Sequence, residues 1–217
     1  KSSKRSFPMI KSLYRYLFNH FDKLHTVSNV IGERFKKLIN NRNKIIILGD
    51  SRVDEIIYRK KNTSHVLLPQ NIYNSKNILF GSIETKDVNL IFKSLNEINK
   101  KINDNGINYI FVPHEPEENI LKQIESNLLE LNIHNCRYTD MDHSKDINAL
   151  IVDVVGILPD LYKFSSISYI GCGFSKGVHN VLEPAIYGNL ISFGPNYQIL
   201  NEAIEMVENN LAESINS

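Results

Sequence analysis

The pattern of apolar positions near the start of the chain predicts two helices. Apolar residues recur at three- and four-residue spacing over 8–21, with basic residues on the opposite face, which is typical of an amphipathic helix. A second helix is predicted over 28–39, because Ser28 has a side chain suited to an N-cap position. We therefore assign residues 1–43 to a basic, helical segment.

From residue 44 onward, short continuous apolar runs alternate with amphipathic segments. Strands are predicted at 44–48, 77–80, 108–112, 149–153, 168–170 and 190–193. Helices are predicted at 87–101, 117–131, 158–164, 181–187 and 197–210. Strands that are apolar throughout are typical of a parallel sheet covered on both faces. The pattern thus predicts an α/β fold with a doubly wound parallel sheet over 44–217.

The composition excludes wholesale disorder, since 42% of the residues are hydrophobic and 23% are charged. The net charge of +1 is unevenly distributed, with +9 over residues 1–44 and −8 over 45–217. This split predicts that the basic segment faces an anionic surface or an acidic partner. Two cysteines, Cys136 and Cys172, are too few for a disulfide framework and indicate reduced thiols in a cytoplasmic protein.

Polar residues follow two of the predicted strands, where ligands bind in open parallel sheets. Gly81 permits close backbone approach, and the adjacent Ser82 offers a hydroxyl to a phosphate; a simple turn is the alternative. His114 and Glu115 stand between two prolines, placed to meet an anionic group and a hydroxyl. A proline-stiffened turn before a helix is the alternative, and these residues alone favour it.

Two later loops carry further candidate ligands. After the strand at 149–153, backbone groups near Gly156 are able to bracket a flat base, with Leu158 packed against it; a loop and a short helix are the alternative. The loop at 171–184 is rich in glycine and leads into a helix, which suits a phosphate or a carboxylate. Its candidate ligands are Gly173, Lys176, Gly177, His179, Asn180 and Glu183.

No grouping of histidine, cysteine and acidic residues has the spacing of metal ligands in the sequence. The sequence also contains no Walker motif and no nucleophile elbow. We therefore expect no metal, no cofactor and no nucleic-acid partner.

Five segments, in this order along the chain, resemble the C-terminal half of 3-deoxy-D-manno-octulosonic acid (Kdo) transferases. They are 48–54, 112–115, 153–156, 171–184 and 193–197. Many family members carry an arginine in place of His114, and a second glycine in place of Val178. The Pro-His-Glu-Pro form at 113–116 resembles the Bacteroidota branch of the family.

The resemblance implies a Rossmann-like domain, the C-terminal half of a GT-B glycosyltransferase, that binds CMP-Kdo as donor. It places Gly156, Ile157 and Leu158 beside the cytosine, and Glu183 on the ribose. The amides near Asn180, together with Ser82, would face the phosphate. Family members transfer Kdo to a lipid A precursor at the cytoplasmic face of the inner membrane, in lipopolysaccharide biosynthesis.

The resemblance also implies that an acceptor-binding domain precedes this half and carries the general base. No residue of this sequence is assigned a catalytic role, so we expect the chain alone to be inactive. The basic helix within residues 4–21 either contacts anionic lipid, through Lys4, Arg5, Lys11 and Arg15, or links the domains. Alternative functions are a GT-B transferase or epimerase that uses a UDP-sugar, and a non-catalytic nucleotide-binding module that needs a separate acceptor-domain chain.

Overall fold

The computed structural model describes residues 8–62, 66–73, 75–99, 106–142 and 145–216. The chain divides into two compact units, Lys1–Lys61 and Asn62–Ser217. Among the described residues, no helix has both the length and the apolar character needed to cross a membrane.

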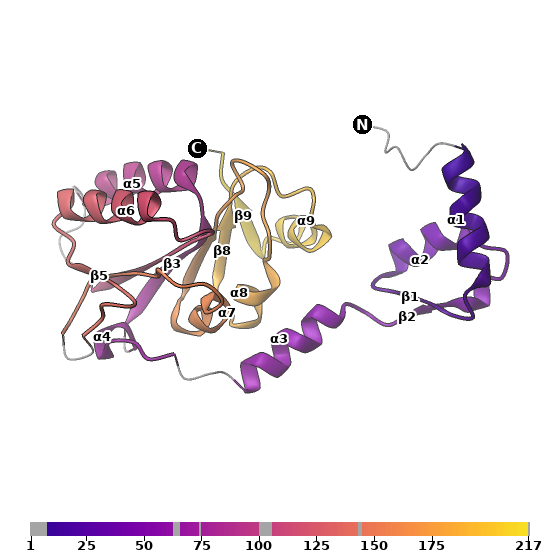
Figure 1. Cartoon of the computed structure of the whole chain (residues 1–217), viewed down its shortest axis with the longest axis horizontal. Coiled ribbons are helices and arrows are strands. Elements are labelled where there is room, and N and C mark those ends of the chain that lie inside the picture. Colours follow the sequence, from indigo (N-terminus) through magenta and orange to yellow (C-terminus); the bar gives the residue numbers. More distant parts are fainter. Residues whose placement is uncertain (1–7, 63–65, 74, 100–105, 143–144, 217) are drawn as a thin grey trace. The chain divides into compact units, whose positions relative to one another are not determined.

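The first unit combines three α-helices with a two-stranded parallel sheet (Figure 1). Its elements are α1 (Pro8–His20), β1 (Leu24–Thr26), α2 (Asn29–Lys36), η2 (Arg42–Lys44), β2 (Ile45–Ile47) and α3 (Ser51–Lys61). The predicted cap is present, because the Ser28 hydroxyl accepts a hydrogen bond from the Ile31 amide at 3.3 Å. The edge-to-face contact of Phe18 with Phe35, at 4.9 Å between ring centroids, packs α1 against α2.

The strand predicted at 44–48 belongs to this first unit and not to the large sheet. β2 pairs in parallel with β1, and the Leu48 amide donates to the Thr26 carbonyl at 3.0 Å. Gly32 of α2 faces this pair of strands, and a Cβ there would make an ordinary contact with the Thr26 hydroxyl oxygen at 3.4 Å. The division between the units therefore falls after Lys61, later in the chain than the predicted boundary after residue 43.

The second unit is built on a seven-stranded sheet in the order β5-β6-β4-β3-β7-β8-β9, and all its pairs are parallel. The strands are β3 (Lys76–Ile83), β4 (Ile107–Pro113), β5 (Asn135–Arg137), β6 (Ala149–Ile151), β7 (Ile167–Ile170), β8 (Leu190–Phe193) and β9 (Ala212–Ser214). The helices are α4 (Gln70–Tyr73), α5 (Thr85–Asn99), α6 (Glu118–Glu130), α7 (Leu158–Leu161), η3 (Tyr162–Phe164), α8 (Leu182–Ile186) and α9 (Asn201–Glu208).

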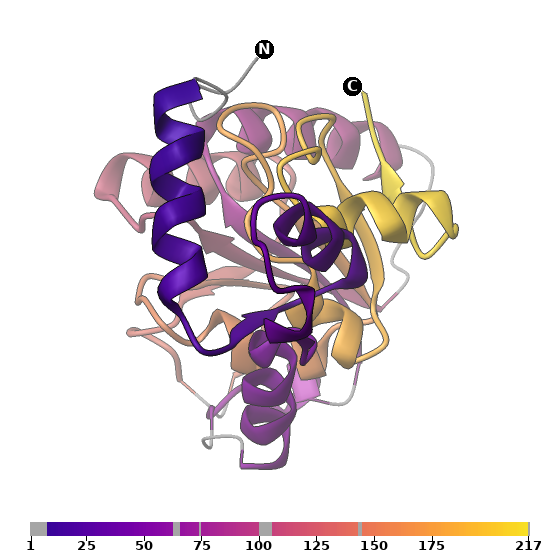
Figure 2. The same cartoon turned by 90° about the vertical axis from the view of Figure 1, so that its right-hand side faces the viewer.

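Hydrophobic cores lie on both faces of this sheet, as predicted. Alternate residues of a strand point to opposite faces, so Leu79 and Ile110 join one core and Phe80 and Phe111 join the other. Helices α5 and α6 cover the second face, while α7 and η3 lie on the first (Figures 1 and 2). Phe111 is fully buried and stacks on Phe80 at 4.9 Å and on Phe92 at 5.4 Å between ring centroids.

The strand order reverses direction at β3, which pairs with β4 on one side and with β7 on the other. The chain builds one half of the sheet outward from β4 and then returns to build the other half from β7. Such a switch point opens a crevice outside the carboxyl ends of the strands. The segments that follow β3, β4 and β7 therefore form the first place to look for a ligand site.

Candidate functional site

The turn after β3 has an unusual backbone. Ser82 adopts φ = +54°, and the pairing of β3 with β4 shifts register between Gly81 and Ile83. Gly171, at the end of β7, lies so close that a Cβ there would be 2.3 Å from the Ser82 carbonyl oxygen. Only glycine permits this approach, and it brings the segments after β3 and β7 into direct contact.

A buried carboxylate holds these two segments together. Asp87 is 1% exposed and accepts hydrogen bonds from the Tyr169 hydroxyl at 2.6 Å and from the Cys172 amide at 2.9 Å. It also accepts from the Glu84 amide at 2.9 Å, as the third residue of a helix does in a capping box. The sequence analysis does not identify Asp87, although an acidic residue in the first turn of a predicted helix is a recognisable capping signal.

Cys172 is buried and adopts the left-handed conformation, with φ = +64°. Its thiol donates to the Ser82 carbonyl oxygen at 3.3 Å. Burial, followed by the nearby carboxylates of Glu84 and Asp87, raises the pKa of the Cys172 thiol to about 12. The thiol is therefore protonated at neutral pH in the protein alone.

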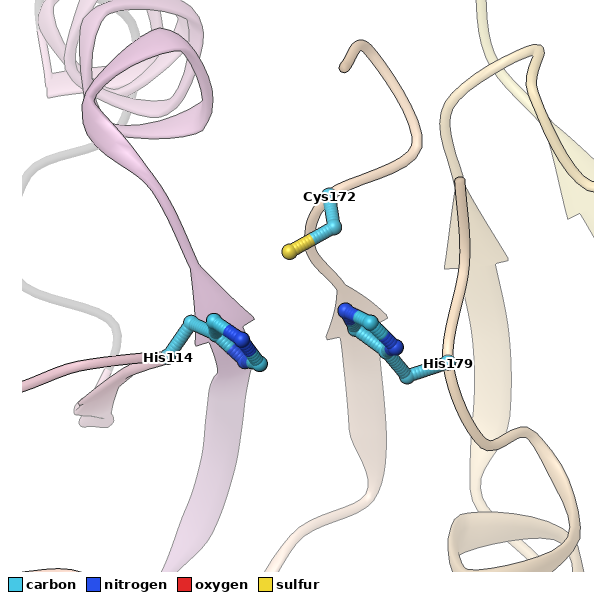
Figure 3. A group of neighbouring side chains, drawn as sticks. All are labelled: His114, Cys172 and His179. Atoms are coloured by element: carbon cyan, nitrogen blue, oxygen red, sulfur yellow. The ribbon is translucent and has the colours of Figure 1, made fainter. Parts of the chain in front are cut away.

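His114 follows β4, where its amide donates to the Ile83 carbonyl at 2.9 Å. Its imidazole stacks on that of His179, with 4.8 Å between ring centroids and 4° between the ring planes. Figure 3 shows the two rings facing each other, beside the thiol of Cys172. Burial, together with the proximity of His114, lowers the pKa of His179, which favours its neutral form.

A cavity of about 260 Å³ opens beside this cluster. Its lining includes His114, Glu115, Glu84 and Lys176. The hydrogen bond from the Ser175 hydroxyl, followed by the Lys176 charge, lowers the pKa of Glu84. The Lys176 ammonium lies 3.5 Å from the Glu84 carboxylate, but its side chain remains 77% exposed. This side of the cavity thus combines the Lys176 ammonium and the His114 imidazole with the carboxylates of Glu84 and Glu115.

Several residues of the glycine-rich loop after β7 have structural roles in packing and hydrogen bonding. A Cβ on Gly173 would lie 2.5 Å from the Gly194 amide nitrogen. Gly177 adopts φ = +114° and approaches Ile199. The Asn180 side chain accepts from the Leu182 amide at 3.0 Å, so it holds the start of α8. These contacts fix the shape of the loop that presents Lys176 and His179.

Three of the remaining predicted residues, Gly81, Leu158 and Glu183, lie near the buried Tyr162. Gly81 is buried, and a Cβ there would lie 2.8 Å from the Tyr162 hydroxyl and 3.1 Å from Leu158. Burial, with a further contribution from the Glu183 charge, raises the pKa of Tyr162. Gly156 adopts φ = +89° in an exposed turn, followed by the half-buried Ile157.

The structure thus divides the predicted residues into two groups. In the first group, the rings of His114 and His179 stack, and Ser82 accepts from the neighbouring thiol of Cys172. Glu115 and Lys176 line the cavity beside them. The second group comprises Gly81, Gly156, Ile157, Leu158 and Glu183, and none of these five residues lines that cavity. Glu84, Asp87, Cys172 and Ser175 belong to the first group, but the sequence analysis does not single them out.

The second unit is thus a Rossmann-like α/β domain, and its switch point lies at β3. The fold matches the crystal structure of the C-terminal CMP-Kdo binding domain of WaaA from Acinetobacter baumannii, with a TM-score of 0.57 and 16% sequence identity. The match covers 76% of this chain and 82% of that one. The predicted α/β fold class is therefore confirmed.

No family model matches the chain. A 3-deoxy-D-manno-octulosonic acid transferase of Rickettsia bellii is 31% identical over 131 residues, which is 60% of this chain and 30% of that protein. The transferase of the same name from Chlamydia muridarum is 28% identical over 209 residues, covering 90% of this chain and 45% of the relative. A bifunctional glycosyltransferase/methyltransferase of Fusobacterium nucleatum is 26% identical over 209 residues, which cover 88% of this chain and 30% of that protein.

The expected resemblance to Kdo transferases is thus confirmed in sequence and in fold. The chain spans less than half the length of these curated relatives.

Proposed function

We propose that the second unit is the donor-binding half of a Kdo transferase of the GT-B class, and that its donor is CMP-Kdo. The proposal rests on one combined observation of sequence and fold. The segments that resemble Kdo transferases include those that form the polar edge of the sheet, on a fold shared with a CMP-Kdo binding domain. The whole transferase would move Kdo to a lipid A precursor.

The two groups of site residues suggest how the donor would lie. The phosphate would face the first group, where the Ser82 hydroxyl, the Lys176 ammonium and the His179 imidazole would donate hydrogen bonds to it. The nucleoside would lie over the second group, with the cytosine beside Gly156 and Leu158. Glu183 would accept hydrogen bonds from the ribose hydroxyls.

In the proposed reaction, an acceptor hydroxyl loses its proton and attacks the anomeric carbon of Kdo. The bond to the CMP phosphate then breaks, and CMP leaves with the bonding electron pair. Donors fixed around the phosphate stabilise that departing charge, which is the part of the reaction assigned to this unit. The general base and most acceptor contacts are assigned to an acceptor-binding domain outside these residues.

Calorimetric titration with CMP, UMP and UDP tests the choice of donor. We expect CMP to bind, and UDP to bind with a dissociation constant at least tenfold higher. A tenfold change in the dissociation constant corresponds to about 1.4 kcal/mol of binding free energy. Binding of UDP in preference to CMP would overturn the proposal in favour of a UDP-sugar transferase or epimerase.

Release of CMP from CMP-Kdo in the presence of a lipid A precursor tests the division of labour. We expect no turnover by this chain alone and turnover once an acceptor-binding domain is supplied. Turnover by the chain alone would show that a general base lies within it. CMP binding without turnover in either case would favour a non-catalytic nucleotide-binding module.

Helix α1 fits either of the two roles expected from the sequence. It leaves Met9, Leu13 and Leu17 exposed, with Lys11 and Arg15 also exposed on the same short helix. Lys4 and Arg5 lie outside the described residues. These features support contact with the anionic cytoplasmic face of the inner membrane. Alternatively, the exposed apolar residues pack on an adjoining acceptor domain.

Flotation with vesicles that contain anionic lipid tests the membrane role. We expect binding by the chain and its loss when Leu13 and Leu17 are both replaced by serine. Neutral vesicles serve as the control for the basic residues. Equal flotation of the double variant, or no flotation of the unmodified chain, would leave the domain-linking role.

A further inference from the structure

Three potential metal ligands converge at the switch point from three separate segments. They are His114 after β4, Cys172 after β7 and His179 in the glycine-rich loop (Figure 3). Their ligand atoms all lie within 4.8 Å of one another. The three positions do not have the spacing of metal ligands in the sequence, because 57 residues separate His114 from Cys172 and 6 separate Cys172 from His179. Only the fold brings them together.

We propose that His114, Cys172 and His179 form a binding site for Zn²⁺ or a chemically similar divalent transition ion. Imidazole nitrogen and thiolate sulfur are the ligands that this class of ion prefers, whereas Mg²⁺ and Ca²⁺ prefer oxygen. Three protein ligands leave one position of a tetrahedral ion for water or an anion.

The distances require only a small closure around the ion. Zn–S bonds of about 2.3 Å and Zn–N bonds of about 2.0–2.1 Å place tetrahedral ligand atoms roughly 3.3–3.6 Å apart. Because the ligand atoms lie within 4.8 Å of one another, each pair needs to approach by at most about 1.5 Å. Both histidine side chains are exposed, so they are free to turn, while Cys172 is buried.

The position of the cysteine is set before any ion binds. Its amide is held by the buried Asp87 carboxylate, and its thiol points at the Ser82 carbonyl oxygen. A bound Zn²⁺ deprotonates a coordinating thiol, so the thiol would exchange its hydrogen bond to Ser82 for a bond to the metal. The Asp87 contact would act as the outer support that orients this ligand.

Titration with Zn²⁺ alone, followed by equilibrium dialysis, tests the site. We expect one equivalent to bind, and each of Cys172→Ser, His114→Ala and His179→Ala to weaken binding by at least roughly tenfold. His134→Ala and Cys136→Ser are the matched controls, because they remove the same types of side chain elsewhere. Cys136 lies on β5, and His134 directly precedes that strand. These control variants should bind Zn²⁺ as the unmodified chain does.

Spectroscopy supplies a second, independent measurement. Co²⁺ in place of Zn²⁺ should give a thiolate-to-metal charge-transfer band that Cys172→Ser lacks and Cys136→Ser retains. Thermal unfolding of each metal-free variant checks that the fold is intact. A missing charge-transfer band in the unmodified chain, or unchanged Zn²⁺ affinity in Cys172→Ser, would overturn the proposal.

This inference is independent of the proposed function, because the titration contains no nucleotide. Failure of CMP to bind would leave the metal result standing, and the reverse also holds. If both are correct, the ion and the donor phosphate lie at the same edge of the sheet.

Discussion

The carboxylate of Asp87 accepts a hydrogen bond from the Tyr169 hydroxyl at 2.6 Å, and both side chains are buried. This contact joins the first turn of α5, which follows β3, to β7, the strand that pairs with β3. The same carboxylate holds the amide of Cys172, so one buried charge organises the turn that begins the glycine-rich loop. Burial, followed by this hydrogen bond, raises the pKa of Tyr169.

Replacing Tyr169 with phenylalanine should lower the free energy of unfolding by about 1.5–3 kcal/mol, because a hydrogen bond to a charged group is lost. Asp87→Ala should cost more, since it leaves three donors without their acceptor. Urea unfolding measures both. Tyr109→Phe is the matched control, because the Tyr109 hydroxyl has no hydrogen-bond partner among the described residues. Equal effects of the two tyrosine variants would contradict this account.

Replacing Gly173 with alanine should lower the free energy of unfolding by about 3 kcal/mol, the upper part of the range for overpacking, because its Cβ would meet backbone atoms of Gly194. Gly188→Ala is the control; its φ of +80° strains alanine by about 1–2 kcal/mol, but nothing lies within 4 Å of the added Cβ. If the proposed function is correct, only Gly173→Ala should also weaken CMP binding. Unchanged stability of Gly173→Ala would show that the loop has room to shift.

Arg137 links β5 to α6 through a pair of carboxylates. It donates to Glu118 at 2.9 and 3.0 Å and to Glu125 at 2.6 and 3.1 Å. Its hydrogen bonds are the main reason that the pKa of Glu118 is lowered in the folded protein. The ionised Glu118 therefore stabilises the fold above its unfolded pKa, and this stabilisation is lost as the pH falls through its folded pKa.

Arg137→Ala should accordingly be less stable than the unmodified protein near pH 7, and the difference should shrink below about pH 3. Urea unfolding at both pH values is the measurement. Lys122→Ala serves for comparison, because its exposed ion pair with Glu118, at 3.5 Å, contributes little. A difference that stays constant with pH would mean that packing of the arginine, and not its charge, supports β5.

Glu183→Ala should weaken CMP binding by about 1–3 kcal/mol if this residue holds the ribose, because a charge-assisted hydrogen bond is lost. Calorimetry measures the affinity, and thermal unfolding measures the stability of the same sample. Glu213→Ala, at an exposed position on β9, is the control. Unchanged affinity together with a lower melting temperature would assign Glu183 a structural role beside Tyr162.

The long, strongly patterned elements were predictable from the sequence. The structure has α1, α5, α6 and the central strands β3 and β4 close to the predicted positions. Three elements of the large unit were not predicted, namely α4, β5 and β9. β5 reads Asn-Cys-Arg and β9 reads Ala-Glu-Ser, so neither edge strand carries the apolar run by which a buried strand is recognised.

The sequence by itself determined the alternation of apolar strands and amphipathic helices, and with it the parallel sheet and the loops at its carboxyl edge. Those features depend on local periodicity, which is written along the chain. Only the tertiary structure decided that β2 pairs with β1, that Asp87 supports Cys172, and that Cys172 lies beside His114 and His179. These contacts join residues far apart in sequence, and their geometry follows from strand order and from close glycine packing, which local patterns do not encode.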